Sequence, residues 1–318
     1  MPAVAALGYL RLKPDALAVA TEHVQRLLPS TDPALRTAAI RALGRMGAVK
    51  AAPALARRAA DAAKRLDRAR KDGVSTAVRD AADELAAALV AVARLRAEGA
   101  AALARARLSD PSATLRAAAV EALGTLGRDQ ADRIEPALRD PDRRVWTAAA
   151  EALGRMGPSA LPALAHAARV ARPDDPELWA ALARALDETG SPEAVPALTL
   201  LLTRSSAEAA AAVALGRIGT KEAAAALLAS LSRPDFAGRA EALDALGGLG
   251  TSGTGPAIAA ELTRDSAEVR AAAARALGRL RHDTAGGRLE ALRSDYDGRV
   301  RRAAVEALSK LPMSRVAR

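Results

Sequence analysis

The chain has 318 residues, of which half are hydrophobic, 2% are aromatic and none is cysteine. The lack of cysteine excludes disulfides, thiolate catalysis and cysteine-ligated metals, and the dominance of Ala, Leu and Val favours helices over strands. A formal net charge of +10 makes nucleic acid, acidic lipid and acidic protein the candidate partners.

One sequence unit recurs along the chain. It is clearest at residues 110–127, DPSATLRAAAVEALGTLG, and at residues 140–157, DPDRRVWTAAAEALGRMG. The glycine of its Ala-Leu-Gly triplet recurs at a spacing of about 30 residues from Gly124 onward, which indicates two helices and two turns per unit. These glycines are Gly8, Gly44, Gly124, Gly154, Gly216, Gly247 and Gly278, with Asp187 and Ser309 in the same place in two weaker copies.

Each unit has the same predicted parts. A first helix carries proline in its opening turn, as at Pro53 and Pro196, and an Asp such as Asp110 then serves as N-cap or turn residue before the second helix. The second helix ends at a pair of glycines, which we expect to supply its left-handed cap. Its narrow apolar stripe cannot keep one unit folded, so neighbouring units are predicted to stack.

In chain order, we expect a single repeat array over residues 1–318. It consists of a partial repeat (1–11), a full repeat (12–47), an elongated basic hairpin repeat (48–98), seven repeats of about 30 residues (99–311) and a tail (312–318). Because Ala6-Leu7-Gly8 matches the end of a unit, we also expect sequence upstream of residue 1.

The elongated repeat departs from the period. We predict a helix over about 51–70, a break at Asp72-Gly73 and a return helix over about 75–97, each roughly 30 Å long, so that the hairpin projects beyond its neighbours. Its cations could belong to an ordinary solvated helix, or they could dock an acidic protein, a second copy or nucleic acid. These candidates are Arg57, Arg58, Lys64, Arg65, Arg68, Arg70 and Lys71.

The signature D-P…R-x-A-A…A-L-G-x-[LM]-G resembles HEAT repeats, specifically the short bacterial type also found in phycobilisome lyase subunits. The resemblance covers nearly the whole chain. It implies an all-α fold, a right-handed α-solenoid of HEAT-like helical hairpins whose second helices line the concave side. It implies little about function, because the family contains scaffolds, lyase subunits and DNA glycosylases.

Eight residues before each repeat glycine lies a position that flanks the apolar stripe and faces the adjacent repeat. The resemblance implies that an Arg here bonds an Asp of the neighbouring unit, forming a ladder. The position holds Arg36, Arg116, Trp146, Trp179, Glu208, Arg239, Arg270 and Arg301.

Both tryptophans of the chain, Trp146 and Trp179, replace that arginine in consecutive repeats. They could form an aromatic platform for a ligand or partner, flanked by Arg144 and Arg184. Alternatively, each indole fills a gap in a core built from alanine.

Three residues before the glycine, the second helix is predicted to face solvent on the concave side. The signs of charge there are mixed, including Glu121, Glu151 and Arg184, which favours a protein partner over a phosphate backbone. The residues seven before the glycine are mostly Ala or Thr, so we expect a smooth groove floor that admits a helix or an extended peptide.

No catalytic, cofactor or metal site is predicted. Gly248, Gly250 and Gly253 match a dinucleotide fingerprint by letter but follow a helix, and the three histidines lie far apart. We therefore expect a non-catalytic protein–protein interaction scaffold that binds a partner on its concave face, with acidic proteins among the candidate partners. The alternatives are a nucleic-acid-binding protein of the DNA glycosylase kind, or a lyase-type chaperone subunit.

The predicted location is the cytoplasm. The first residues lack the basic and apolar regions of a signal peptide, and no apolar run approaches the ~20 residues that span a bilayer. The absence of cysteine leaves the periplasm open, and the sequence leaves the oligomeric state open.

Overall fold

The computed structural model describes residue 4 and residues 13–170 and 176–312, and every regular element in these ranges is an α-helix or a 3-10 helix. The chain divides into two compact units, Met1–Ala163 and Leu164–Arg318, called unit 1 and unit 2 below. The predicted partial repeat at the N-terminus, apart from Val4, and the tail from residue 313 lie outside the described residues. That the two units form one continuous array stays a prediction.

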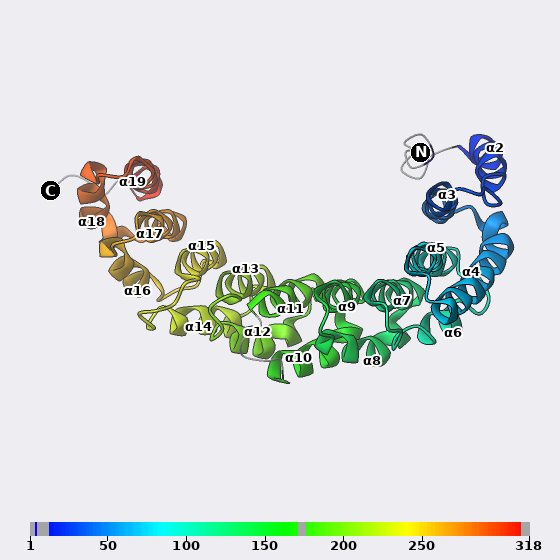
Figure 1. The fold of residues 1–318 in the computed structure, drawn as a ribbon. Helices are drawn as coiled ribbons and strands as arrows, with labels where there is room; N and C mark the ends of the chain where they lie inside the picture. The colour runs from blue at the N-terminus through cyan, green and yellow to red at the C-terminus, as the bar shows by residue number, and fades with distance from the viewer. Residues whose placement is uncertain (1–3, 5–12, 171–175, 313–318) are drawn as a thin grey trace. The chain divides into compact units, whose positions relative to one another are not determined.

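In unit 1, successive second helices pack side by side, and the first helices form another row behind them (Figure 1). The second helices are α3 (Pro33–Arg45), α5 (Ser75–Arg94), α7 (Ala113–Leu126) and α9 (Arg143–Arg155). The first helices are α2 (Pro14–Gln25), α4 (Ala52–Asp72), α6 (Ala100–Arg105) and α8 (Ala131–Ile134), with 3-10 turns η1 (Val49–Ala51), η2 (Arg128–Gln130), η3 (Glu135–Arg139) and η4 (Gly157–Ala160).

Unit 2 repeats this arrangement. The division between the units falls within α10 (Leu161–Val170). The stacked second helices are α11 (Pro176–Thr189), α13 (Glu208–Ile218), α15 (Arg239–Leu249), α17 (Ala267–Leu280) and α19 (Gly298–Lys310). Between them lie α12 (Val195–Leu201), α14 (Lys221–Ser230), α16 (Gly255–Ala260) and α18 (Gly286–Ala291), with η5 (Pro192–Ala194), η6 (Glu261–Thr263), η7 (Asp283–Ala285) and η8 (Leu292–Ser294). These stacked hairpins confirm the predicted all-α solenoid.

The predicted long hairpin is present as α4 and α5, joined at Gly73 in the left-handed conformation. Ala91 of α5 lies against Gly44 of the preceding second helix, as Ala152 of α9 lies against Gly124. The first residue of α5 precedes Ala91 by 16 residues, whereas the first residue of α9 precedes Ala152 by 9. At 1.5 Å per residue, α5 is therefore extended by roughly 10 Å beyond an ordinary second helix.

The two glycines that end a second helix have different roles, which corrects the expectation that the pair supplies the cap. Gly247 lies inside α15, and a Cβ there would lie 2.5 Å from the Cα of Ala276 in α17. Gly250 takes φ +65 and forms the left-handed cap. The first glycine therefore allows two helices to approach closely, and only the second reverses the chain.

Candidate functional site

The predicted ladder is present at Arg116 and Arg270, whereas Arg36 and Arg239 bond a glutamate, Glu84 and Glu261, in place of the aspartate. Nε and Nη2 of Arg116 donate to the two carboxylate oxygens of Asp140 at 2.7 and 2.8 Å, and Nη1 donates to two carbonyls of its own turn. Arg270 binds Asp295 in the same way, at 2.8 and 2.9 Å. Hydrogen bonds from Arg270 lower the pKa of the Asp295 carboxyl. These arginines hold neighbouring repeats together and are occupied by that contact.

Two members of the ladder use different residues for the same contact. In α13, Glu208 replaces the arginine and accepts hydrogen bonds from Nη2 of Arg233 at 2.8 Å and from the backbone N–H of Ala237 at 2.6 Å. The charges of this ion pair are thus reversed relative to Arg116 and Asp140. In α11, Trp179 replaces the arginine. The guanidinium carbon of Arg204, which lies outside α11, is 4.6 Å from the centroid of the Trp179 ring, so a cation–π contact takes the place of the ion pair.

The tryptophans are core residues. Trp179 is 1% exposed and Trp146 is 6% exposed, so neither offers an open ring face. This burial contradicts the predicted aromatic platform and supports the alternative that each indole fills a gap between small residues. The two rings also belong to different units, Trp146 to unit 1 and Trp179 to unit 2.

The charged row on the second helices is exposed or half-buried, as predicted. Several of its charges are paired within the row or with a neighbouring helix. Glu121 lies 3.1 Å from Nη2 of Arg94, and Asp244 lies 2.6 Å from Nη2 of Arg275. Glu151 lies 3.7 Å from Nη1 of Arg155 in its own helix. Arg184 lies in unit 2 and is exposed.

A groove of about 410 Å³ opens on the second helices of unit 1. We call its small apolar lining residues the floor and its remaining, arginine-rich lining residues the walls. The floor residues are Gly44, Ala86, Ala87, Val90, Ala91, Ala117, Ala118 and Ala148, and the wall residues are Arg41, Arg45, Arg94, Thr114, Glu121 and Arg144. Four of the six wall residues are cations, and one is an anion.

Two arginines of the groove are available to a ligand in different ways. Arg41 is exposed, and within the described parts of the chain no hydrogen bond or ion pair engages its guanidinium. Arg144 is 64% exposed and donates from Nε and Nη2 to Asp142 at 3.0 and 2.9 Å. Hydrogen bonds from Arg144 lower the pKa of Asp142 to about 2. A ligand carboxylate can bind Arg41 directly and compete with Asp142 for Arg144.

Among the predicted site residues, the groove brings together Arg144 and Glu121. Arg45 and Arg94 were not expected there. Arg94 follows the departure from the repeat period, so its place could not be read from the spacing. Arg41 belongs to the charged row that the spacing identifies, but only the packing shows that it lies beside an alanine floor.

The predicted basic hairpin divides into structural and free cations. Arg58 and Arg65 lie 3.3 and 2.7 Å from the carboxylate of Glu84, whose side chain is fully buried and also binds Arg36 at 2.9 Å. Burial acts to raise the pKa of Glu84, but hydrogen bonds from Arg65 and Arg36 bring that pKa below its ordinary value. Arg70 binds Asp110 at 2.5 Å. Arg58 and Arg65 therefore hold the two helices of the hairpin together, and Arg70 binds the hairpin to the next repeat.

The remaining hairpin cations are exposed, and no ion pair engages them among the residues that the structure describes. They are Arg57, Lys64, Arg68 and Lys71. Over the same residues, no helix is long and apolar enough to cross a membrane. No cluster of three His, Cys, Asp or Glu that could hold a metal ion occurs in residues 13–170 and 176–312.

Known structures match the chain at low sequence identity. A chain of a homology model of the full-length AP-3 complex is 16% identical over 98% of this chain and 54% of its own, with a TM-score of 0.58. An engineered protein is 21% identical over 97% and 94% of the two chains, with a TM-score of 0.47. The complex of CpcE and CpcF of phycocyanin lyase from Nostoc sp. PCC7120 matches at 21% identity over 95% of this chain and 96% of its own, with a TM-score of 0.35. At 16% identity, the likeness to the AP-3 chain concerns the fold alone.

Family models identify the repeats. The comparison with curated proteins finds no match. Residues 35–61 match the model of the PBS lyase HEAT-like repeat, as the sequence resemblance implies. The model described as HEAT repeats matches residues 100–175, 170–247 and 255–317, well over half of the chain. The chain therefore belongs to the HEAT repeat family.

Proposed function

We propose that this protein is a non-catalytic interaction scaffold that binds an acidic segment of another protein in the groove of unit 1. The observation that carries the proposal is the groove itself, an alanine floor between walls in which four arginines accompany one glutamate. The floor buries the small or apolar side of a ligand, and the walls attract its carboxylates.

The dimensions of the groove fit a peptide. Its lining comes from four successive helices, α3, α5, α7 and α9. Packed helices lie about 8–10 Å apart, so three such steps span roughly 27 Å. An extended chain covers that distance with about eight residues. A segment of this length can place carboxylates near both Arg41 and Arg144.

The lining supports a protein partner more than nucleic acid. Its floor is apolar and carries no aromatic ring on which a base could stack, and Glu121 would repel a phosphate backbone. The lining also supports binding rather than catalysis. Its one hydroxyl group is that of Thr114, and no histidine lies in the wall to act as its base.

The proposal is tested with a defined probe. The probe is a fluorescent twelve-residue peptide of alanine and glutamate, and its control replaces each glutamate with glutamine. Fluorescence anisotropy should show that the glutamate peptide binds. The affinity of the glutamine peptide should be about tenfold or more lower, because its charge-assisted hydrogen bonds to arginine are lost.

The matched variants keep the fold and change one surface at a time. Arg41→Gln with Arg144→Gln should lower the affinity for the glutamate peptide by about tenfold or more, since both positive charges are removed from the groove. Arg184→Gln removes an exposed arginine of unit 2 that occupies the same repeat position as Arg41, and it should leave binding of the peptide unchanged. Equal affinity for the two peptides, or equal loss in the two variants, would refute the proposal.

A further inference from the structure

Helix α4 carries a second cationic surface, which lies outside the row of helices that forms the groove (Figure 1). The ion pairs described above use Arg58, Arg65 and Arg70 to hold the hairpin against Glu84 and Asp110. The remaining cations of the helix serve no such contact among the described residues. Their arrangement, rather than their number, is informative.

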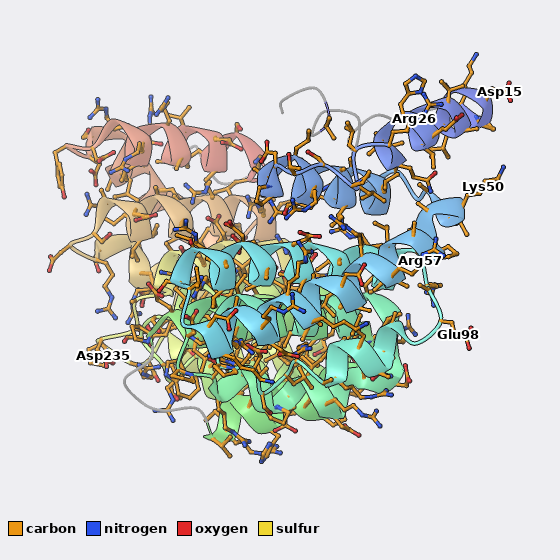
Figure 2. All side chains as sticks on the ribbon, turned by 45° about the vertical axis from the view of Figure 1, so that its right-hand side comes forward. Asp15, Arg26, Lys50, Arg57, Glu98 and Asp235 are labelled. Atoms are coloured by element: carbon orange, nitrogen blue, oxygen red, sulfur yellow. The ribbon has the colours of Figure 1, made fainter. Side chains whose placement is uncertain are left out.

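These free cations lie on one side of the helix. At about 100° per residue, Arg57, Lys64, Arg68 and Lys71 fall within about 60° of its circumference. Arg57, Lys64 and Lys71 are spaced by seven residues, and Lys50 in η1 lies seven residues before Arg57. We call these four residues, Lys50, Arg57, Lys64 and Lys71, the heptad stripe. All four are exposed, and Figure 2 shows Lys50 and Arg57 following one another along this part of the chain.

The spacing of the stripe sets the kind of partner it fits. Within α4, successive stripe residues are about 10.5 Å apart along the axis, and Arg57 and Lys71 are about 21 Å apart. Along a helix of a partner protein, carboxylates repeat at the same distance when acidic residues recur every seven positions. A nucleic acid strand presents a phosphate about every 3.4 Å of axis and winds away from a straight row. The stripe therefore matches the charge repeat of an acidic helix.

We propose that the heptad stripe docks an acidic helix of a partner protein, aligned along α4. Acidic residues at one heptad position of that helix face Lys50, Arg57, Lys64 and Lys71 in turn. Pairs of this kind set partner choice and orientation between helices. The proposal is independent of the groove, because no stripe residue lines it.

The probe is a stapled helical peptide of 28 residues that carries glutamate at one heptad position. Its control has the same composition and staple, with the glutamates spread around the helix. A third probe is a 20-base-pair DNA duplex. We expect the heptad peptide to bind at least about tenfold more tightly than the other two probes at low salt, with affinity falling as salt screens the charges.

The stripe variant is Arg57→Gln with Lys64→Gln and Lys71→Gln. Its control, Arg105→Gln with Arg128→Gln and Lys221→Gln, removes three exposed cations elsewhere. The heptad peptide should lose about tenfold or more in affinity with the stripe variant and little with the control. The groove variant, Arg41→Gln with Arg144→Gln, should bind the heptad peptide normally, which separates this proposal from the groove proposal.

Several results would overturn the proposal. They are equal binding of the heptad and redistributed peptides, tighter binding of the duplex, equal loss in the stripe and control variants, or no binding of the heptad peptide to the wild-type protein. Circular dichroism of each variant confirms that its helices remain folded before binding is compared.

Discussion

Replacing Glu84 with glutamine should destabilise unit 1 strongly. The carboxylate is fully buried and contacts Arg36, Arg58 and Arg65, whose side chains are 9%, 22% and 39% exposed. In Glu84→Gln the cluster keeps three positive charges and loses its anion. Breaking a buried pair by removing one partner costs about 3–5 kcal/mol. Because Arg58 and Arg65 retain access to water, we expect the low end, about 3 kcal/mol.

Urea unfolding followed by circular dichroism measures this loss. With a denaturant slope of about 2 kcal/mol per molar urea, the midpoint of the transition that reports unit 1 should fall by about 1.5 M. The matched control is Glu151→Gln, which removes a carboxylate that is 61% exposed and should change the midpoint little. If Glu84→Gln behaves like this control, the hairpin arginines are not held by a buried anion, and their division into structural and free cations is incorrect.

Three further predictions concern the repeat contacts of unit 2. Gly247→Ala should cost about 1–3 kcal/mol in thermal unfolding because its Cβ would lie 2.5 Å from the Cα of Ala276, whereas Gly248→Ala, which meets nothing within 4 Å, should not destabilise. Arg270→Asp should lower the melting temperature, and adding Asp295→Arg should recover part of the loss; no recovery would show that the contact depends on more than charge. The pKa of Asp295 is lowered in the folded protein. The ionised carboxylate therefore contributes its full stabilisation above pH 3.8, its ordinary pKa, and this stabilisation is lost as pH falls through the folded-state pKa. Acid titration of Arg270→Gln should therefore show a smaller loss of stability below about pH 4 than the wild-type protein shows.

The repeat spacing predicts contacts that recur with the period. Arg116 and Arg270 occupy the same place in the unit, and each binds the carboxylate expected from the resemblance. The long hairpin also follows from the sequence, because Gly73 interrupts two long runs of helix-forming residues. Periodic features of this kind depend on local geometry that every copy shares.

The spacing does not predict contacts in which a residue binds a partner that does not recur with the repeat period. Trp179 looks available in the sequence, but Arg204 from the next repeat lies over its ring. Arg58 and Arg65 look like surface charges, but both bind the fully buried carboxylate of Glu84. Each case depends on which residue of a neighbouring element reaches the position, and for Glu84 the lengthened repeat also removes the alignment that would identify it.

The anisotropy titration of the alanine–glutamate peptide tests directly whether the groove of unit 1 recognises an acidic segment. We expect wild-type protein and Arg184→Gln to bind the peptide with the same affinity, and Arg41→Gln with Arg144→Gln to bind it about tenfold or more weakly. Undiminished binding by the double variant would contradict the claim that the arginines of the groove recognise an acidic segment.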